Sequence, residues 1–498
     1  MEKILLLYNS FTLYSIQTTD GVLALKENLI SIAKNLHDKI LVGKSLFNKY
    51  ISKILSPQKN LIAFVVVVFA AALSWQAIPD YRSDHRFYLP ELSSEQTSNT
   101  LPVLKSSFIS DTTQNFVHAA SMTELPDGRL LAAWLNGSRE GGGDVVISGA
   151  NYDPKADLWG ENFELISIAK VQRHLDRNVR KLGNPVLTTL PNGRVVMYYV
   201  SVAVGGWAGS SINTVYSDDS GVTWSPTKKI ITSPFFNIST LVKGNPVLYS
   251  DGSIGLPVYH EFIGKFAEFL RLTSDGKLIE KTRLTYGNHS LQPVVVPINQ
   301  TEATALMRYA GKGERRMLIT KTRDSGRSWK AERKTTIPNP NSALTALRLD
   351  DGSLISVVND LNRYRYRLSL YRSTDEGESW QKLHMFDDSE NHQAELLCAG
   401  NSDRCSNGFN WPQFSRETYA PLLKADFLAS VGENRQHLVD EYLGHMDARV
   451  CRGSRCRFQY DYPYLIQSSQ GDFHLLYSWN KSFIKHVQFN RAWLESLI

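Results

Sequence analysis

The sequence predicts an all-β protein whose main part is a six-bladed β-propeller. Two turn repeats that alternate along the chain carry this prediction, and an uncharged apolar stretch near the N-terminus adds one helix. A propeller blade is a four-stranded sheet, so repeated turn signals at a regular spacing are typical of blades. The predicted organisation is a helical segment at 1–59, a transmembrane helix at 60–79, a linker at 80–107 and a propeller at 108–498, with an insertion at 388–457 before the last blade.

The first repeat is a tight turn followed by an apolar strand. Its clear copies contain Asp-Gly or Asn-Gly, which mark hairpins because glycine takes the positive φ that the turn needs. Two weaker copies bring the number to six, one for each predicted blade. The copies are Leu125–Trp134, Leu190–Tyr199, Tyr249–Tyr259, Pro297–Met307, Leu349–Val358 and Ser468–Tyr477.

The second repeat has the pattern Ser/Thr-x-Asp-x-Gly-x-x-Trp and occurs at 217–224, 322–329 and 373–380. Its aspartates lie 105 and then 51 residues apart, as if one copy had decayed between the first two. Remnants stand at 273–276 and 151–159. We expect the aspartate to cap a tight hairpin, the glycine to take the left-handed conformation and the tryptophan to pack between sheets. These residues are therefore predicted to be structural.

The stretch Leu61–Ile78 has no charged residue over 18 positions and is long enough to cross a bilayer. A buried core segment is the alternative, but four consecutive valines followed by alanines show no amphipathic period. Lysines precede the stretch and mixed charges follow it, which favours a cytoplasmic N-terminus. The expected location is the cell inner membrane, crossed once, with the propeller in the periplasm or outside the cell.

Charge and cysteine content narrow the choice of partners. The net charge is +6, and eight lysines against four acidic residues before residue 60 account for four of these charges. The rest of the chain is nearly neutral, so nucleic-acid binding is not expected. Two close cysteine pairs, Cys398 with Cys405 and Cys451 with Cys456, are typical of disulfides on the exported side, whose pairing stays open. Zinc binding is the alternative, although these spacings are loose for it.

The second repeat is similar to the Asp-box of sialidases and related BNR-repeat proteins, and the resemblance covers roughly residues 108–498. It implies the sialidase fold and cleavage of a ketoside whose anomeric carbon carries a carboxylate. In that family an arginine triad holds the carboxylate, because guanidinium forks suit it. A tyrosine acts as the nucleophile, a glutamate accepts the tyrosine proton and an aspartate protonates the leaving group.

Three positions match the family's arginine and tyrosine motifs. Ala305–Arg308 resembles the motif of the second triad arginine, and Arg365–Leu370 that of the third. Tyr462 opens the last blade, where the family places its nucleophile. The resemblance therefore implies that Arg308 and Arg365 bind substrate and that Tyr462 attacks it.

The loop after the first strand pair of blade one holds the predicted acid. The resemblance implies a substrate contact for Arg139 and general-acid catalysis by Asp144, with Glu140 in reserve. Glycine- and asparagine-rich segments near blade boundaries read as sugar-contacting loops or as tight turns. In one of them, Trp207 is expected to stack on a sugar ring.

Two positions depart from the family. His118 stands where the first triad arginine is expected, and Gln292 stands at the position of the glutamate. A glutamine side chain cannot accept the tyrosine proton. Glu261, beside His260, is the nearest alternative base, and His118 and Gln292 are retained as substrate-binding candidates.

Three functions are compatible with these residues. The first is a sialidase-like retaining exo-glycosidase that releases a terminal acidic keto-sugar, either sialic acid or the Kdo of lipopolysaccharide. The second is a polysaccharide lyase that uses histidine and tyrosine on a uronate-containing glycan. The third is a non-catalytic propeller that binds glycan or protein, because fold does not decide function. No cofactor and no metal site are predicted, and the sequence identifies no membrane partner protein.

Overall fold

A computed structural model describes the propeller almost completely and the N-terminal part in pieces. The described residues are 31, 57–76, 85–89, 101–110, 116–233, 237–388, 414–415, 424, 428, 439, 441, 451–452, 455–456 and 458–498. The chain divides into two compact units, residues 1–82 and 83–498. The second unit contains the propeller.

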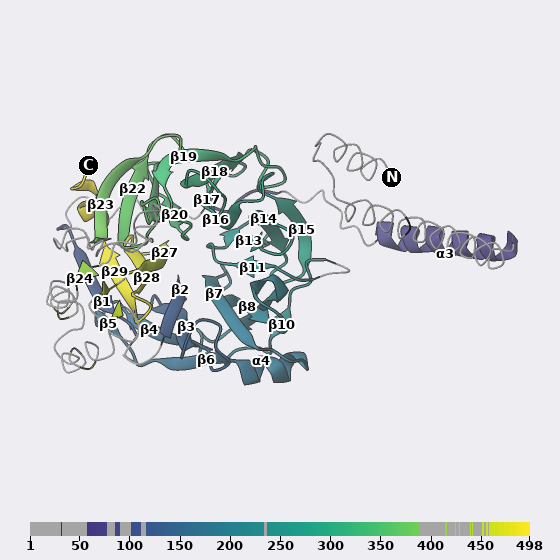
Figure 1. Cartoon of the computed structure of the whole chain (residues 1–498), viewed down its shortest axis with the longest axis horizontal. Helices are drawn as coiled ribbons and strands as arrows, with labels where there is room; N and C mark the ends of the chain where they lie inside the picture. The colour runs from purple at the N-terminus through teal and green to yellow at the C-terminus, as the bar shows by residue number, and fades with distance from the viewer. Residues whose placement is uncertain are drawn as a thin grey trace, which may run out of the picture. The chain divides into compact units, whose positions relative to one another are not determined.

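Six antiparallel sheets are arranged around a common centre, which confirms the predicted all-β propeller (Figure 1). Blade one comprises β2 (Phe116–Glu124), β3 (Leu130–Gly137), β4 (Val146–Asp153), β5 (Leu158–Trp159) and β6 (Phe163–Ser167). Blade two comprises β7 (Lys181–Thr189), β8 (Val195–Val202), β9 (Ser210–Ser217) and β10 (Lys228–Lys229). Blade three comprises β11 (Leu241–Val242), β12 (Val247–Leu248), β13 (Ile254–His260), β14 (Phe266–Leu272) and β15 (Leu278–Arg283).

The remaining three blades follow the same order of strands. Blade four comprises β16 (Ser290–Pro297), β17 (Ala303–Tyr309), β18 (Arg316–Thr322) and β19 (Arg333–Pro338). Blade five comprises β20 (Thr345–Arg348), β21 (Leu354–Val358), β22 (Arg367–Ser373) and β23 (Gln381–Asp388). Blade six comprises β27 (Tyr460–Gln467), β28 (Phe473–Trp479), β29 (Phe483–Phe489) and β1 (Leu104–Phe108). Short helices α4 (Ile168–Leu175), η2 (Trp207–Gly209) and α8 (Arg491–Glu495) complete the propeller.

The ring is closed by strands from both ends of the propeller. Strand β1 pairs antiparallel with β29 over the register Leu104↔Phe489 to Phe108↔Lys485. The propeller thus begins at Leu104, a few residues before the predicted boundary at 108. Residues 85–89 also contact it, since the buried Phe87 lies against Tyr249 with ring centroids 5.1 Å apart.

The Asp-box turns lie between the third and fourth strands of their blades and have the predicted structural role. In the copy at 373–380, Ser373 Oγ donates to Asp375 Oδ1 at 2.7 Å, and Asp375 Oδ1 accepts from the Ser379 amide at 2.8 Å. Gly377 has φ +91°, and Trp380 Nε1 donates to its carbonyl at 3.0 Å. The copies at 217–224 and 322–329 repeat the aspartate cap and the tryptophan bond. In each copy, the hydrogen bonds of the aspartate and the tryptophan side chains lie within the turn.

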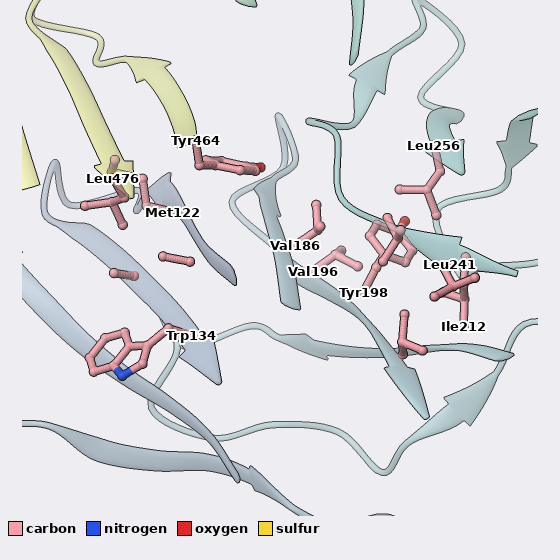
Figure 2. Close-up of a cluster of buried hydrophobic side chains, with 14 of the residues drawn as sticks. Met122, Trp134, Val186, Val196, Tyr198, Ile212, Leu241, Leu256, Tyr464 and Leu476 are labelled. Atoms are coloured by element: carbon pink, nitrogen blue, oxygen red, sulfur yellow. The ribbon is translucent and has the colours of Figure 1, made fainter. Parts of the chain in front are cut away.

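The hydrophobic core lies between neighbouring blades rather than at one central point. One cluster joins side chains of blades one, two, three, four and six, among them Trp134, Tyr198 and Tyr464, all at most 1% exposed (Figure 2). Fully burying a large apolar side chain contributes roughly 1.5–3 kcal/mol. The cluster therefore fixes the positions of the blades relative to one another.

The features predicted outside the blades are only partly described. Helix α3 spans Pro57–Gln76, where the transmembrane helix was predicted. Among the described residues, none of the helices has the length and apolar character that a bilayer crossing requires, so the predicted span is not confirmed. In the insertion, β24 (Phe414–Ser415), β25 (Cys451–Arg452) and β26 (Arg455–Cys456) form a small sheet. Cys451 and Cys456 are opposite each other in its register, whereas Cys398 and Cys405 lie outside the described residues, so the disulfides stay a prediction.

Candidate active site

Each blade has one residue in the left-handed conformation either within its innermost strand or two to four residues before that strand begins. These residues have φ values between 31° and 62° and none of them is glycine. Such a conformation costs a non-glycine residue about 1–3 kcal/mol and is retained mainly where function needs it. The six residues, one from each blade, are Ala119, Asn184, Ser239, Gln292, Asn341 and Tyr462.

In four of these strands the left-handed residue lies in a β-bulge. The register with the second strand shifts at His118/Ser121, Gly183/Val186, Leu291/Val294 and Asp461/Tyr464. A bulge bends its strand and redirects a side chain, and proline within a sheet is largely confined to edges and bulges. Pro185, Pro293 and Pro463 follow three of the left-handed residues directly. Two of these side chains, Gln292 and Tyr462, are in direct contact, and Asn184 bonds to Tyr259 of the neighbouring blade.

A hydrogen-bonded chain of three side chains joins blades four and six. Gln292 Nε2 donates to the phenolic oxygen of Tyr462 at 2.9 Å, and Arg308 Nη1 donates to Gln292 Oε1 at 2.9 Å. Gln292 is 1% exposed. The structure thus brings three sequence-predicted residues together, and it places Gln292 against Tyr462, where the family has its glutamate.

The second arginine joins this chain through Asn341. Arg308 Nε donates to Asn341 Oδ1 at 2.6 Å, and Arg365 Nη2 donates to the Asn341 carbonyl at 2.6 Å. Arg365 Nη1 also donates to Asp461 Oδ1 at 2.9 Å. Asp461 is fully buried; burial raises its pKa, but Arg365 outweighs this and holds the pKa below its ordinary value. Asn341 therefore accepts hydrogen bonds from both guanidinium groups, through its side chain from Arg308 and through its carbonyl from Arg365.

His118 packs on the tyrosine from blade one. The ring centroids of His118 and Tyr462 are 4.2 Å apart, and His118 Nδ1 is 3.1 Å from Ser478 Oγ. Burial lowers the pKa of His118 to about 3. The imidazole is therefore neutral at physiological pH, so it does not replace the positive charge of the arginine that the family has here.

The two candidates for the catalytic acid, Asp144 and Glu140, both lie in the loop between β3 and β4 but make different contacts. Asp144 is exposed, and its carboxylate accepts bonds from the Ser138 amide and hydroxyl at 2.8 and 2.9 Å. Glu140 instead reaches blade six, with Oε2 3.2 Å from Lys481 Nζ. Burial raises the pKa of Glu140, but its ion pair with Lys481 outweighs this, so the pKa lies below its ordinary value. Glu140 is thus the carboxylate of this loop that interacts with the Tyr462 cluster, while Arg139 is exposed beside Asp144.

Glu261 and Trp207 lie at the side of blades two and three. The amide of Glu261 donates to Ser239 Oγ at 2.8 Å, and among the described contacts its carboxylate makes no hydrogen bond with Tyr462. His260 stacks on Phe266. Trp207 packs over Gly183, where an added Cβ would be 2.7 Å from its ring. The structure therefore does not bring these residues onto Tyr462.

Three residues that the sequence did not single out, Tyr259, Asp461 and Lys243, surround the tyrosine together with Asn341, which lies in one of the predicted asparagine-rich segments. Tyr259, 2% exposed, accepts from Asn184 Nδ2 at 3.1 Å and is 3.5 Å from Gln292 Nε2. Asn341 and Asp461 orient the arginines, and Lys243 lies beneath the Tyr462 ring, 5.8 Å from its centroid. A proline inside an otherwise regular inner strand could have predicted the bulges from the sequence. No pattern in the sequence could have identified Lys243 or Asp461 as residues of the site.

The described residues contain no group of three or more His, Cys, Asp or Glu side chains that could hold a metal ion. The site is built from arginine, lysine, amide, imidazole, phenol and carboxylate groups. Such groups bind a carboxylate and hydroxyls and can move a proton.

Comparisons with known proteins place the chain in a family. No curated protein sequence matches it. Similar solved structures include a Hadza microbial sialidase, Hz136, at 14% identity and TM-score 0.52, covering 77% of this chain and 66% of that one. A protein of unknown function from Dyadobacter fermentans matches at 12% identity and TM-score 0.53, covering 78% and 98%. An alpha-L-arabinanase from Penicillium chrysogenum matches at 12% identity and TM-score 0.51, covering 80% and 100%.

These likenesses establish the fold that the chain shares with sialidases. The family model for the BNR repeat-like domain matches residues 128–475, which is more than half of the chain. The matched region runs from the first turn of blade one into β28 of blade six. This protein therefore belongs to the BNR repeat-like domain family.

Proposed function

We propose that this propeller is a glycoside hydrolase that removes a terminal sugar bearing a carboxylate at its anomeric carbon, sialic acid or Kdo. The observation that carries the proposal is the chain Arg308–Gln292–Tyr462. It places a cation and a candidate nucleophile within one hydrogen-bonded unit. The family relationship and the glycosidases among its structural neighbours support the same class of reaction.

The charge balance around Tyr462 favours an anionic substrate. Arg365 is paired with Asp461, and Lys481 with Glu140. Arg308 makes its described hydrogen bonds only to the neutral groups of Gln292 and Asn341. A partly buried guanidinium without a carboxylate partner is stabilised by an incoming anion. A substrate carboxylate supplies that anion.

The proposed reaction assigns one step to each of these side chains. Arg308 and Arg365 hold the substrate carboxylate, and the Tyr462 oxygen attacks the anomeric carbon, as in enzymes that use a tyrosine because a charged nucleophile would be repelled. Gln292 donates to that oxygen and stabilises negative charge on it. The neutral imidazole of His118 accepts the phenolic proton, since a phenolate beside it favours the charged imidazolium. The attack breaks the anomeric C–O bond, and the departing oxygen takes a proton from water. Glu140, which is ionised beside Lys481, then acts as the general base for the water that releases the sugar from Tyr462.

The test is release of free sugar acid from synthetic sialyl and Kdo ketosides by the purified protein. Tyr462→Phe is expected to lower kcat by at least about 10³-fold, because the attacking oxygen is lost. Tyr477→Phe, which alters a buried tyrosine of the same blade away from the arginines, is the control for folding. Full activity of Tyr462→Phe, or release of neither sugar by folded wild type, contradicts the proposal.

A second function, β-elimination on a uronate, is favoured by one observation. The partner stacked on Tyr462 is the neutral His118, and no described carboxylate bonds to the phenol. A lyase needs a neutral base beside the proton α to a carboxylate, with that carboxylate neutralised by groups such as Arg308. The two functions are distinguished by their products. Elimination gives an unsaturated uronate that absorbs ultraviolet light, whereas hydrolysis gives a saturated sugar.

The proposed location follows from the sequence alone. We propose that the propeller works in the periplasm or outside the cell, held at the inner membrane by the segment around α3. The apolar sequence of Leu61–Ile78 and its lysine-rich N-terminal flank support this location. Fractionation of cells that express the whole chain tests it, and recovery in the soluble fraction alone contradicts it.

A further inference from the structure

We propose that Lys243 is a buried cation that controls the activity of Tyr462, switching the site off when it loses its proton. This inference rests on the proposed function, because it assigns the regulation of the same tyrosine. It concerns a residue that takes no part in the reaction described above. Lys243 follows β11 in blade three and is 2% exposed.

The segment around Lys243 crosses from blade three to the strands that carry the site. Lys243 Nζ donates to the Pro463 carbonyl at 3.3 Å, and Asn245 Nδ2 donates to the Leu465 carbonyl at 3.0 Å. Gly244 passes so close to blade four that an added Cβ would be 2.1 Å from Pro293 O. The segment thus contacts both the residue after Gln292 and the residue after Tyr462, so it braces the two bulges against each other.

The ammonium group lies over aromatic rings instead of a carboxylate. Nζ is 4.9 Å from the ring centroid of Tyr464 and 5.8 Å from that of Tyr462. A cation over an aromatic face is attracted by it, and the attraction grows when water is excluded. The groups facing Nζ from β27 are these two rings and the Pro463 carbonyl; Gln292 and Tyr259 of the adjacent strands are neutral. No carboxylate of the described residues forms an ion pair with Lys243.

A lysine in this position is sensitive to pH. Burial lowers the pKa of Lys243 to about 7. Below that pH the charged ammonium stabilises negative charge developing on the Tyr462 oxygen, and above it this stabilisation disappears. Nζ makes no hydrogen bond with the phenol, so the lysine acts as a charge and a positioning residue rather than as a base.

The experiment compares kcat and KM from pH 5 to pH 10 for wild type, Lys243→Met, Lys243→Arg and Asn245→Ala. In wild type, kcat is expected to fall as pH rises through about 7, with little change in KM. Lys243→Met lowers kcat about 10- to 100-fold at pH 6 and abolishes the fall, because a buried charge near the developing anion is gone. Lys243→Arg keeps its charge, so it keeps activity and loses the fall. Asn245→Ala removes a brace hydrogen bond without changing charge, so it keeps the fall.

A fall near pH 7 that persists in Lys243→Met overturns the inference, and so does loss of the fall in Asn245→Ala. A second measurement does not need a substrate. Because Lys243 binds its proton more weakly when folded, the stability of wild type relative to Lys243→Met is expected to rise between pH 7 and pH 10. A flat difference overturns the inference even when the protein cleaves ketosides. If the stability difference rises but the protein cleaves no ketoside, the proposed function is rejected. Burial of the Lys243 ammonium is then established, but the switch is rejected because there is no reaction for it to control.

Discussion

The Asp-box turns and the bulges of the innermost strands both contain residues in the left-handed conformation, but their side chains find hydrogen-bond partners in different places. Each Asp-box aspartate bonds only to residues two and four positions away in its own turn, and glycine takes one of the left-handed positions. Each bulge residue of the site contacts another blade: Gln292 reaches Tyr462, 170 residues away. The side chains of the Asp-box turns thus make their hydrogen bonds within one blade and stabilise it, whereas the side chains of the candidate site make theirs between blades.

The comparison first separates Glu140 from Asp144. Asp144 is bonded within its own loop, like an Asp-box aspartate, whereas Glu140 reaches blade six. Glu140→Gln is expected to lower kcat about 10²-fold or more, the usual contribution of a general acid or base, and Asp144→Asn to leave it within about twofold. Steady-state kinetics on a ketoside measures both. The reverse order of effects would restore Asp144 as the acid and break the comparison.

Replacing Arg308 tests how much substrate binding depends on a guanidinium group that Gln292 and Asn341 hold in position. Arg308→Lys keeps the charge but cannot bond both Gln292 and Asn341 while it binds a carboxylate. We expect kcat/KM to fall about 10- to 100-fold, since a lost charge-assisted hydrogen bond costs about 1.5–3 kcal/mol. Arg333→Lys, on the outer strand of the same blade, is the matched control and should retain full activity. Equal effects of the two changes would contradict the assignment.

Asn341 and Gly377 test the two uses of the left-handed backbone directly. Asn341→Gly relieves a strained φ and loses the bond to Arg308, so the free energy of unfolding should change by less than about 1 kcal/mol while kcat/KM falls about tenfold. Gly377→Ala puts a Cβ at φ +91°, 2.7 Å from Ile319 Cδ1. It should lose about 1–3 kcal/mol of stability and keep its activity per folded molecule. Urea unfolding and kinetics on the same samples measure both quantities, and parallel losses in either variant would refute the distinction.

The smallest expected effect is the response of an Asp-box to acid. Burial raises the pKa of Asp375, but the hydrogen bonds from Ser379 and Ser373 together outweigh it and lower the pKa to about 2. A carboxylate whose pKa is lower when folded stabilises the protein above its ordinary pKa, and this stabilisation is lost as pH falls toward about 2. The difference in melting temperature between wild type and Asp375→Asn should therefore narrow from pH 5 to pH 2. A constant difference would mean that the turn does not depend on the charge.

The same distinction explains what the sequence could predict. The hairpin turns and Asp-boxes are local, so eight consecutive residues such as 217–224 are enough to identify them. The prediction that Tyr462, Arg308 and Arg365 share one site came from resemblance to a family, and the structure brings these side chains together. Asp461 and Lys243 could not be identified, because nothing near them in the sequence shows that a buried charge will meet an arginine or an aromatic ring from another blade.

The pairing of β1 with β29 has a mechanical and kinetic consequence. The ring cannot close on the ribosome until its last strand has been synthesised, so the first strand stays unpaired for nearly the whole of translation. Once closed, β1 lies antiparallel along β29 over five residue pairs. Leu104 lies opposite Phe489, so tension between residue 101 and residue 498 acts at one end of this pair. Its hydrogen bonds would therefore break one after another from that end, and a chain pulled from both sides would begin to open at its final blade.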